Sequence, residues 1–241
     1  MDGGPLPAAP APFTDAELET LSHAGRASCE QGCVTQFGAT LGEHEGVKAY
    51  SNCQASCIHD QYSWMNLMTK QVSIHSGAPK QEGLRYVGLV YQCVEYARRW
   101  WMHHLGVTFG DVDSAADIMS LSHYIDLRSD VQERPLGRSV NGEARRAPQR
   151  GDLLIYQARR ASPSWRFGHV AVVVGVSLEA GYIEVAEQNL TNAPWAAPER
   201  YARRLQLTQL SEGRYQVLDV TPGEVADERS GEVLGWVYPL P

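Results

Sequence analysis

Apolar residues recur at helical spacing in one clear segment of the first half of the chain. The repeat follows Gln92, and its apolar positions are Val94, Ala97, Trp101 and Leu105. Residues three and four apart share a helix face, so this spacing predicts a helix with one buried side, and Gly106 is expected to end it. A shorter helix is predicted after Thr14, where Glu17 completes a capping box, and another after Asp113.

The second half of the chain carries short runs of β-branched and aromatic residues bounded by Gly, Pro, Asp or Ser. These runs predict strands, at 153–156, 170–174, 182–186, 215–218 and 233–237. The polar stretch 128–150 predicts a long loop, 29–57 is glycine-rich and irregular, and 58–90 predicts no defined element. Helices first and strands afterwards indicate an α+β fold, in which N-terminal helices pack on an antiparallel β-sheet.

Charge and apolar content exclude several partners. The chain has 241 residues and a net charge of −7, from 21 Lys and Arg against 28 Asp and Glu. We therefore expect no nucleic-acid partner and no binding along an anionic membrane. The longest apolar stretch, 169–176, is far too short to span a bilayer. Residues 1–13 are rich in Pro and Ala and lack the features of a signal peptide, so they predict a flexible linker.

Five cysteines divide into two Cys-x-x-x-Cys pairs, 29/33 and 53/57, and one separate cysteine, Cys93. We expect two disulfides and therefore an oxidising compartment; a zinc site and four reduced thiols are the alternatives. If each pair lies on a helical turn, both of its side chains point the same way. Two such turns side by side predict bridges from Cys29 to Cys57 and from Cys33 to Cys53. The crossed pairing requires parallel turns, which the short connection disfavours.

Cys93 stands at the start of the predicted central helix. Helix N-terminal amides stabilise a thiolate, so Cys93 is a candidate nucleophile, and Gln92 offers an amide donor for an oxyanion. His169 opens the most apolar strand, and Glu187 follows the next one, where a carboxylate can hold the second ring nitrogen of a histidine. Each residue alone has an ordinary alternative: a buried structural cysteine, a surface histidine and a polar strand end. Together their order predicts a papain-like Cys–His–Glu site.

No metal or cofactor is expected. His103 and His104 are adjacent, so they cannot share a helix face, and we expect them to be exposed. His44, His59 and His75 show no ligand spacing, and the sequence has no glycine-rich phosphate loop.

Several ordered blocks of the sequence resemble the CHAP family, the cysteine- and histidine-dependent amidohydrolases/peptidases. Within it, they are most similar to the amidase domain of glutathionylspermidine synthetase/amidases and of trypanothione synthetases. The blocks are 37–42, 46–52, 91–100, 111–115, 168–173, 186–189 and 234–236. The resemblance runs from about Phe37 to about Tyr238. It implies a papain-like fold and a CHAP amidase domain at 14–241, with a cysteine-rich elaboration at about 28–58.

The resemblance also implies a role for each candidate residue. The nucleophile, the base, the residue that orients the base and an oxyanion-hole donor are expected to be Cys93, His169, Glu187 and Gln92, respectively. Arg98 and Asn189 match positions that line the substrate site. The family chemistry, which needs no cofactor, is hydrolysis of the amide between the glycine carboxyl of glutathione and an amine of spermidine. The expected substrate is therefore a small peptide–polyamine conjugate.

Three departures from the family pattern leave the substrate open, one of which is the divergent segment between Asn52 and Tyr86. The synthetase half is absent from the sequence, so we expect hydrolysis without synthesis. The four N-terminal cysteines are not part of the family pattern, and bridging them would place the protein outside the cytoplasm, where peptidoglycan is a possible substrate. The alternatives are therefore a secreted or effector-type peptidoglycan amidase or endopeptidase, acting as an antibacterial toxin with an immunity protein as partner, and a binding module without activity. Intact Cys93, His169 and Glu187 argue against the binding module.

Overall fold

The computed structural model describes residues 11–128, 132–227 and 229–241, so most of the predicted linker lies outside the described part. The first helix, α1 (Asp15–Ala27), begins where the capping residues predict. The Thr14 hydroxyl accepts a hydrogen bond from the Glu17 amide at 3.3 Å, and the Glu17 carboxylate accepts one from the Thr14 amide at 2.7 Å. This capping box satisfies backbone donors that have no partner inside the helix.

Nine antiparallel strands form the main sheet, in the order β13-β12-β11-β10-β9-β14-β8-β7-β6. They are β6 (Val107–Phe109), β7 (His123–Asp126), β8 (Gln132–Val140), β9 (Leu153–Tyr156), β10 (His169–Ser177), β11 (Tyr182–Ala186), β12 (Arg203–Gln209), β13 (Tyr215–Leu218) and β14 (Val233–Pro239). The five strands predicted from the sequence are among them. The predicted loop at 128–150 is wrong, since β8 occupies much of it. Pairing with β14 and β7 holds β8 in the sheet despite its polar composition.

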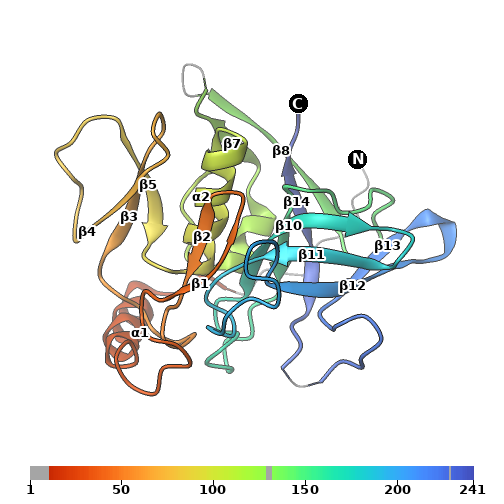
Figure 1. Ribbon diagram of the computed structural model, residues 1–241, viewed down its shortest axis with the longest axis horizontal. Coiled ribbons are helices and arrows are strands. Elements are labelled where there is room, and N and C mark those ends of the chain that lie inside the picture. Colours follow the sequence, from red (N-terminus) through yellow and green to blue (C-terminus); the bar gives the residue numbers. More distant parts are fainter. Residues whose placement is uncertain (1–10, 129–131, 228) are drawn as a thin grey trace.

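Both faces of β10 are covered, which explains its unbroken apolar run. Val170 joins a core with Trp101 of the central helix α2 (Cys93–His104), whereas Ala171 joins a second core on the opposite face of the sheet. In Figure 1, α2 lies between the main sheet and a smaller sheet of three strands. This packing on two sides fixes the N-terminal end of α2 relative to β10.

Two smaller sheets precede α2. A hairpin is formed by β1 (Thr40–His44) and β2 (Val47–Tyr50), and a three-stranded sheet by β3 (Tyr62–Asn66), β4 (Val72–His75) and β5 (Leu84–Leu89). The sequence patterns predicted none of these strands, which are short and only partly buried. Helices and strands are therefore not segregated along the chain, although the fold class is α+β, as predicted.

The helices have different roles in the fold. The helix α2 packs on the main sheet. The helix α1 contacts a loop at each of its ends. Before it, Phe13 lies against Phe167, with ring centroids 5.0 Å apart, and near its C-terminal end Gly25 packs against Ile58. The helix expected after Asp113 is a short 3-10 helix, η1 (Ala115–Ser120). No helix within the described ranges is long and apolar enough to cross a membrane.

Two disulfides cross-link the segment between α1 and β3. They join Cys29 to Cys57 and Cys33 to Cys53, the pairing expected from the sequence, and Cys93 is free. The reason differs from the expected one, because all four bridged cysteines lie outside the helices. The hairpin of β1 and β2 returns the chain in the opposite direction, and this brings the two pairs together in a nested order.

Candidate active site

Cys93 is the first residue of α2, as the sequence predicted. Tyr91, two residues earlier, has a left-handed backbone with φ of 58°, a conformation that residues other than glycine seldom adopt. Its ring lies near the rings of Phe37 and Tyr50, at centroid distances of 4.9 and 5.2 Å. These contacts hold the turn that leads from β5 into α2. The turn leaves Cys93 only 9% exposed, beside the amide groups of the helix N-terminus.

His169 begins β10 and is almost completely buried. The residue before it, Gly168, has φ of 66°, and a Cβ atom there would lie 2.5 Å from the carbonyl oxygen of Tyr156. Glycine is therefore needed to bring the chain into the strand at this point. The Nε2 atom of His169 lies 2.8 Å from Oε2 of Glu187, just after β11, so Nδ1 is the ring nitrogen left for the contact with Cys93.

His169 and Glu187 are held in their ionised forms by neighbouring charges of opposite sign. Burial alone would lower the pKa of His169, but hydrogen bonds and charge interactions with Cys93 and Glu187 raise it to about 9. Burial alone would raise the pKa of Glu187, but Arg203 and His169 lower it to about 2. At neutral pH the imidazole is therefore a cation next to a carboxylate. A thiol, an imidazolium and a carboxylate in this order are the parts of a cysteine hydrolase site.

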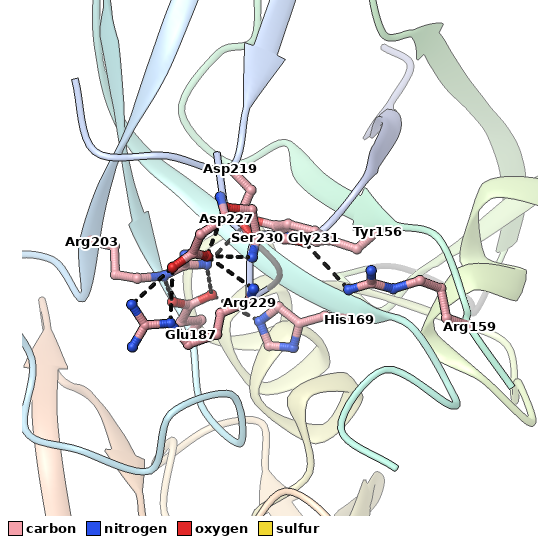
Figure 2. Close-up of polar contacts among 10 residues, drawn as sticks. All are labelled: Tyr156, Arg159, His169, Glu187, Arg203, Asp219, Asp227, Arg229, Ser230 and Gly231. Atoms are coloured by element: carbon pink, nitrogen blue, oxygen red, sulfur yellow. Dashed lines mark hydrogen bonds and ion pairs between the residues drawn. The ribbon is translucent and has the colours of Figure 1, made fainter. Parts of the chain in front are cut away.

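The line of charges continues beyond Glu187 to two residues that the sequence analysis missed. Arg203, the first residue of β12, donates from Nε to Oε1 of Glu187 at 2.5 Å and from a terminal nitrogen to Asp219 at 2.6 Å. The Tyr156 hydroxyl lies against the same pair, at 3.3 Å from Arg203 and 3.4 Å from Asp219. Figure 2 shows Arg203 between the two carboxylates, with His169 on the far side of Glu187. The alternation of Leu205 and Leu207 with polar residues is a strand signal that could have revealed β12.

Gln92 is held at both ends of its side-chain amide. Its Nε2 atom donates to the backbone carbonyl of Cys57 at 2.8 Å, and its Oε1 atom accepts from Nδ2 of Asn189 at 2.8 Å. Asn52 donates to the same Cys57 carbonyl at 2.7 Å and to Oδ1 of Asn189 at 3.1 Å. An amide nitrogen carries two hydrogens, so the contact with Cys57 leaves a second hydrogen of Gln92 that can be donated to a ligand.

Gln188 ties the sheet to the helix, a role that the sequence analysis did not assign. It is buried, and its Nε2 atom donates to the backbone carbonyl of Gln92 at 3.0 Å and to Oε2 of Glu95 at 2.7 Å. Its Oε1 atom accepts from the amide of Tyr50 at 2.9 Å. Glu95 also forms a buried ion pair with Arg99, one turn further along α2, at 2.7 Å. These contacts fix the position of the first turn of α2 relative to the end of β11.

The structure brings Gln92, Cys93, His169, Glu187 and Asn189 together and directs Arg98 elsewhere. The Arg98 guanidinium is buried. It donates to the carbonyls of Val87, Phe109 and Gly110 and to the carboxylate of Asp111. These bonds link α2 to β5 and to the end of β6. The predicted role of Arg98 in substrate binding therefore stays a prediction.

One group of side chains in the described residues has the composition of a metal site: His44, Glu45 and His104. The sequence analysis expected His104 to be exposed, but its side chain is 14% exposed because α2 packs against the β1–β2 turn. The indole of Trp100 donates to Nδ1 of His44, which leaves the hydrogen of the neutral ring on Nε2, the atom that faces Glu45. Arg150 also pairs with Glu45. These partners fit a hydrogen-bonded cluster better than a set of metal ligands.

With this geometry in view, the comparisons with known proteins are informative. Residues 84–189 match the CHAP domain. The chain carries a CHAP domain. Its matched range begins with β5 and ends at Asn189, so it includes Gln92, Cys93, His169 and Glu187. Arg203 and Asp219 lie beyond it.

The CHAP domain and its surroundings are similar to parts of larger enzymes. The chain is 33% identical over 154 residues to the bifunctional glutathionylspermidine synthetase/amidase of Escherichia coli, covering 63% of this chain and 22% of that protein. It is 30% identical over 203 residues to the trypanothione synthetase of Crithidia fasciculata, covering 83% of this chain and 26% of that enzyme. The chain thus spans about a quarter of the length of these relatives.

Proposed function

We propose that this protein is a cysteine amidase in which Cys93 is the nucleophile, His169 the acid and base, and Glu187 the residue that orients His169. The observation that carries the proposal is the buried pair of His169 and Glu187, 2.8 Å apart, with Cys93 at the start of α2 beside His169, all within the range that matches the CHAP domain. Gln92 and the Cys93 backbone amide are the donors for the oxyanion. This is amide hydrolysis through a thioester.

In the first half of the reaction, the Cys93 thiolate attacks the carbonyl carbon of the amide. A carbon–sulfur bond forms, and the carbonyl electron pair moves onto the oxygen, where Gln92 Nε2 and the helix N-terminus stabilise it. When this intermediate collapses, the carbon–nitrogen bond breaks. His169 then gives its proton to the leaving amine, and an acyl thioester remains on Cys93.

In the second half, His169 acts as a base. It takes a proton from a water molecule as the water oxygen adds to the thioester carbonyl. The carbon–sulfur bond then breaks, which releases the acid and returns the Cys93 thiolate beside the His169 imidazolium. Glu187 stays ionised throughout, because its low pKa of about 2 keeps it charged at neutral pH.

We assign a glutathionylspermidine-type amide as the substrate. The support is the similarity to enzymes whose names include this activity or a related synthesis, over a range that contains all the proposed catalytic residues. The leaving group would be a polyamine, and a chain with a net charge of −7 presents no general repulsion to such a cation.

The test is mass spectrometry of glutathionylspermidine after incubation with the purified protein. We expect glutathione and spermidine as products, and none with Cys93→Ala, whose fold is checked by circular dichroism. Activity of the variant at a tenth of wild type or more would contradict the thiol mechanism. Absence of cleavage by the wild type would reject this substrate.

One observation favours a second substrate class. The two disulfides suit an oxidising compartment, so we propose an extracytoplasmic location, where peptidoglycan peptide amides are within reach. The same incubation with purified peptidoglycan separates the two proposals. New amino and carboxyl termini in the released fragments, together with intact glutathionylspermidine, would select the cell-wall substrate.

A further inference from the structure

The side chain of Gln92 takes its orientation from a loop that is distant in sequence. One end of the amide meets Asn189, at the boundary of the CHAP match, and the other meets the carbonyl oxygen of Cys57, 35 residues before it. An oxyanion donor is effective only when it is fixed before the reaction, since reorientation during the reaction costs part of its stabilising effect. The position of the Cys57 carbonyl therefore decides where the free hydrogen of Gln92 points.

The Cys57 carbonyl lies in backbone that no helix or sheet ladder holds. The stretch from 51 to 61 is irregular. Three features fix Cys57 instead: its amide donates to the Gln54 carbonyl at 3.1 Å, the side chain of Asn52 donates to its carbonyl, and its sulfur is bonded to Cys29, which lies just after α1. Of these, the disulfide is the only covalent one, and Cys57 itself is completely buried.

We propose that the Cys29–Cys57 disulfide is a positioning element for catalysis, which acts through the Cys57 carbonyl on the oxyanion donor Gln92. The inference rests on the proposed function, in which Gln92 stabilises the oxyanion. Loss of this bridge leaves Cys93, His169 and Glu187 in place and loosens Gln92. It therefore lowers the rate of the chemical step more than the binding of substrate.

The second disulfide provides a matched control. Cys53, bonded to Cys33, lies four residues before Cys57, and its carbonyl accepts from the amide of Val34 at 3.1 Å. Both bridges are buried at the Cys53 and Cys57 ends and close loops of similar length, with sequence separations of 20 and 28. They differ in that only Cys57 carries the hydrogen bond from Gln92.

The test is a double-mutant cycle on kcat for glutathionylspermidine hydrolysis. The bridges are removed by mutation and not by a reductant, because a reductant also acts on oxidised forms of Cys93. We expect Gln92→Ala to lower kcat about 100-fold and Cys29→Ser/Cys57→Ser to lower it about tenfold, with KM changed less than kcat. In the Gln92→Ala background, loss of this bridge is expected to cost less than about twofold, whereas Cys33→Ser/Cys53→Ser costs the same factor in both backgrounds.

Equal costs of the Cys29–Cys57 loss in both backgrounds would overturn the inference, as would the same non-additivity for the control bridge. If the double serine variant does not fold, Asn52→Ala removes the other support of the Cys57 carbonyl and is expected to be non-additive with Gln92→Ala in the same way. The side-chain amide of Gln92 in a ¹⁵N NMR spectrum, assigned by its loss in Gln92→Ala, is a readout independent of turnover. Its signal is expected to shift on loss of the first bridge and to stay in place on loss of the second. Absence of hydrolysis by the wild type would instead reject the proposed substrate.

Discussion

At the scale of single residues, the site is a chain of alternating charges. Beside Cys93, the His169 imidazolium, the Glu187 carboxylate, the Arg203 guanidinium and the Asp219 carboxylate follow one another. Buried charges of this kind are stable only when each has a partner of opposite charge. Removal of one residue therefore leaves its neighbour without a charge partner. Each member can therefore be tested through the pKa of the next.

We expect Glu187 to set the upper pH limit of the proposed activity. The thiolate–imidazolium pair is lost when His169 deprotonates, so kcat/KM is expected to fall as the pH rises through about 9. Glu187→Gln removes a charge that raises the pKa of His169, and the alkaline limb of the pH–rate profile should move to lower pH. This variant should lose less kcat than His169→Ala, because an amide oxygen still orients the ring. Equal losses in the two variants would mean that Glu187 has another role.

We expect Arg203 to set the lower pH limit of the proposed activity in the same way. Without it, burial opposes the charge of Glu187 and only His169 compensates, so Arg203→Gln should raise the pKa of Glu187 from about 2. A protonated Glu187 no longer stabilises the imidazolium, and the acid limb of the profile is expected to move to higher pH. The neighbouring Arg204, which pairs with Glu184 at 2.8 Å, supplies the control Arg204→Gln. The role assigned to Arg203 would be lost if both variants gave the wild-type acid limb.

At the scale of elements, the sequence predicted those whose apolar pattern is strong. The repeat after Gln92 and the run from Val170 to Val174 are buried in α2 and β10, and both appear where expected. The missed strand β8 begins with exposed polar residues, and only the pairing on its two sides keeps it extended. The positions of the proposed nucleophile and base thus follow from local pattern, whereas Arg203 and Asp219 reach Glu187 and each other only through contacts between strands distant in sequence.

Gly168 lies just before β10 and sets the direction in which the chain enters this strand. Its replacement tests how far the position of β10 depends on this residue. In Gly168→Ala the new Cβ atom would lie 2.5 Å from the carbonyl oxygen of Tyr156. This oxygen belongs to the backbone, which cannot move aside as easily as a side chain can. Gly213 also has a positive φ, of 71°, but open space around it. The left-handed backbone should cost each alanine variant about 1–2 kcal/mol in the free energy of unfolding. Gly168→Ala should lose more than Gly213→Ala, and it alone should lose kcat; urea denaturation and turnover measure both. Equal losses of stability would show that the backbone around Tyr156 adapts.

At the scale of the whole molecule, the cysteine-rich N-terminal part is built into the site. The CHAP match begins at residue 84, yet the preceding segment supplies the Cys57 carbonyl to Gln92 and the Tyr50 amide to Gln188. It also binds the chain after Glu187, where Trp195 donates from its backbone to Leu41 at 2.8 Å. A domain boundary between the two parts would cut through these contacts. The disulfides therefore stabilise the same unit that carries the proposed chemistry.

Whether the four N-terminal cysteines are bridged or reduced in protein isolated from its native compartment tests the proposed extracytoplasmic location. A bridge in a loop of this size is expected to contribute about 2–4 kcal/mol to the free energy of unfolding, by restricting the unfolded chain. A non-reducing peptide map, after alkylation of the denatured protein, is expected to show Cys29 linked to Cys57, Cys33 linked to Cys53, and alkylated Cys93. The hairpin β1–β2 runs antiparallel between the two pairs, so crossed peptides would contradict the nested geometry. Four alkylated thiols besides Cys93 would remove the support for an extracytoplasmic location and favour a cytoplasmic polyamine-conjugate substrate.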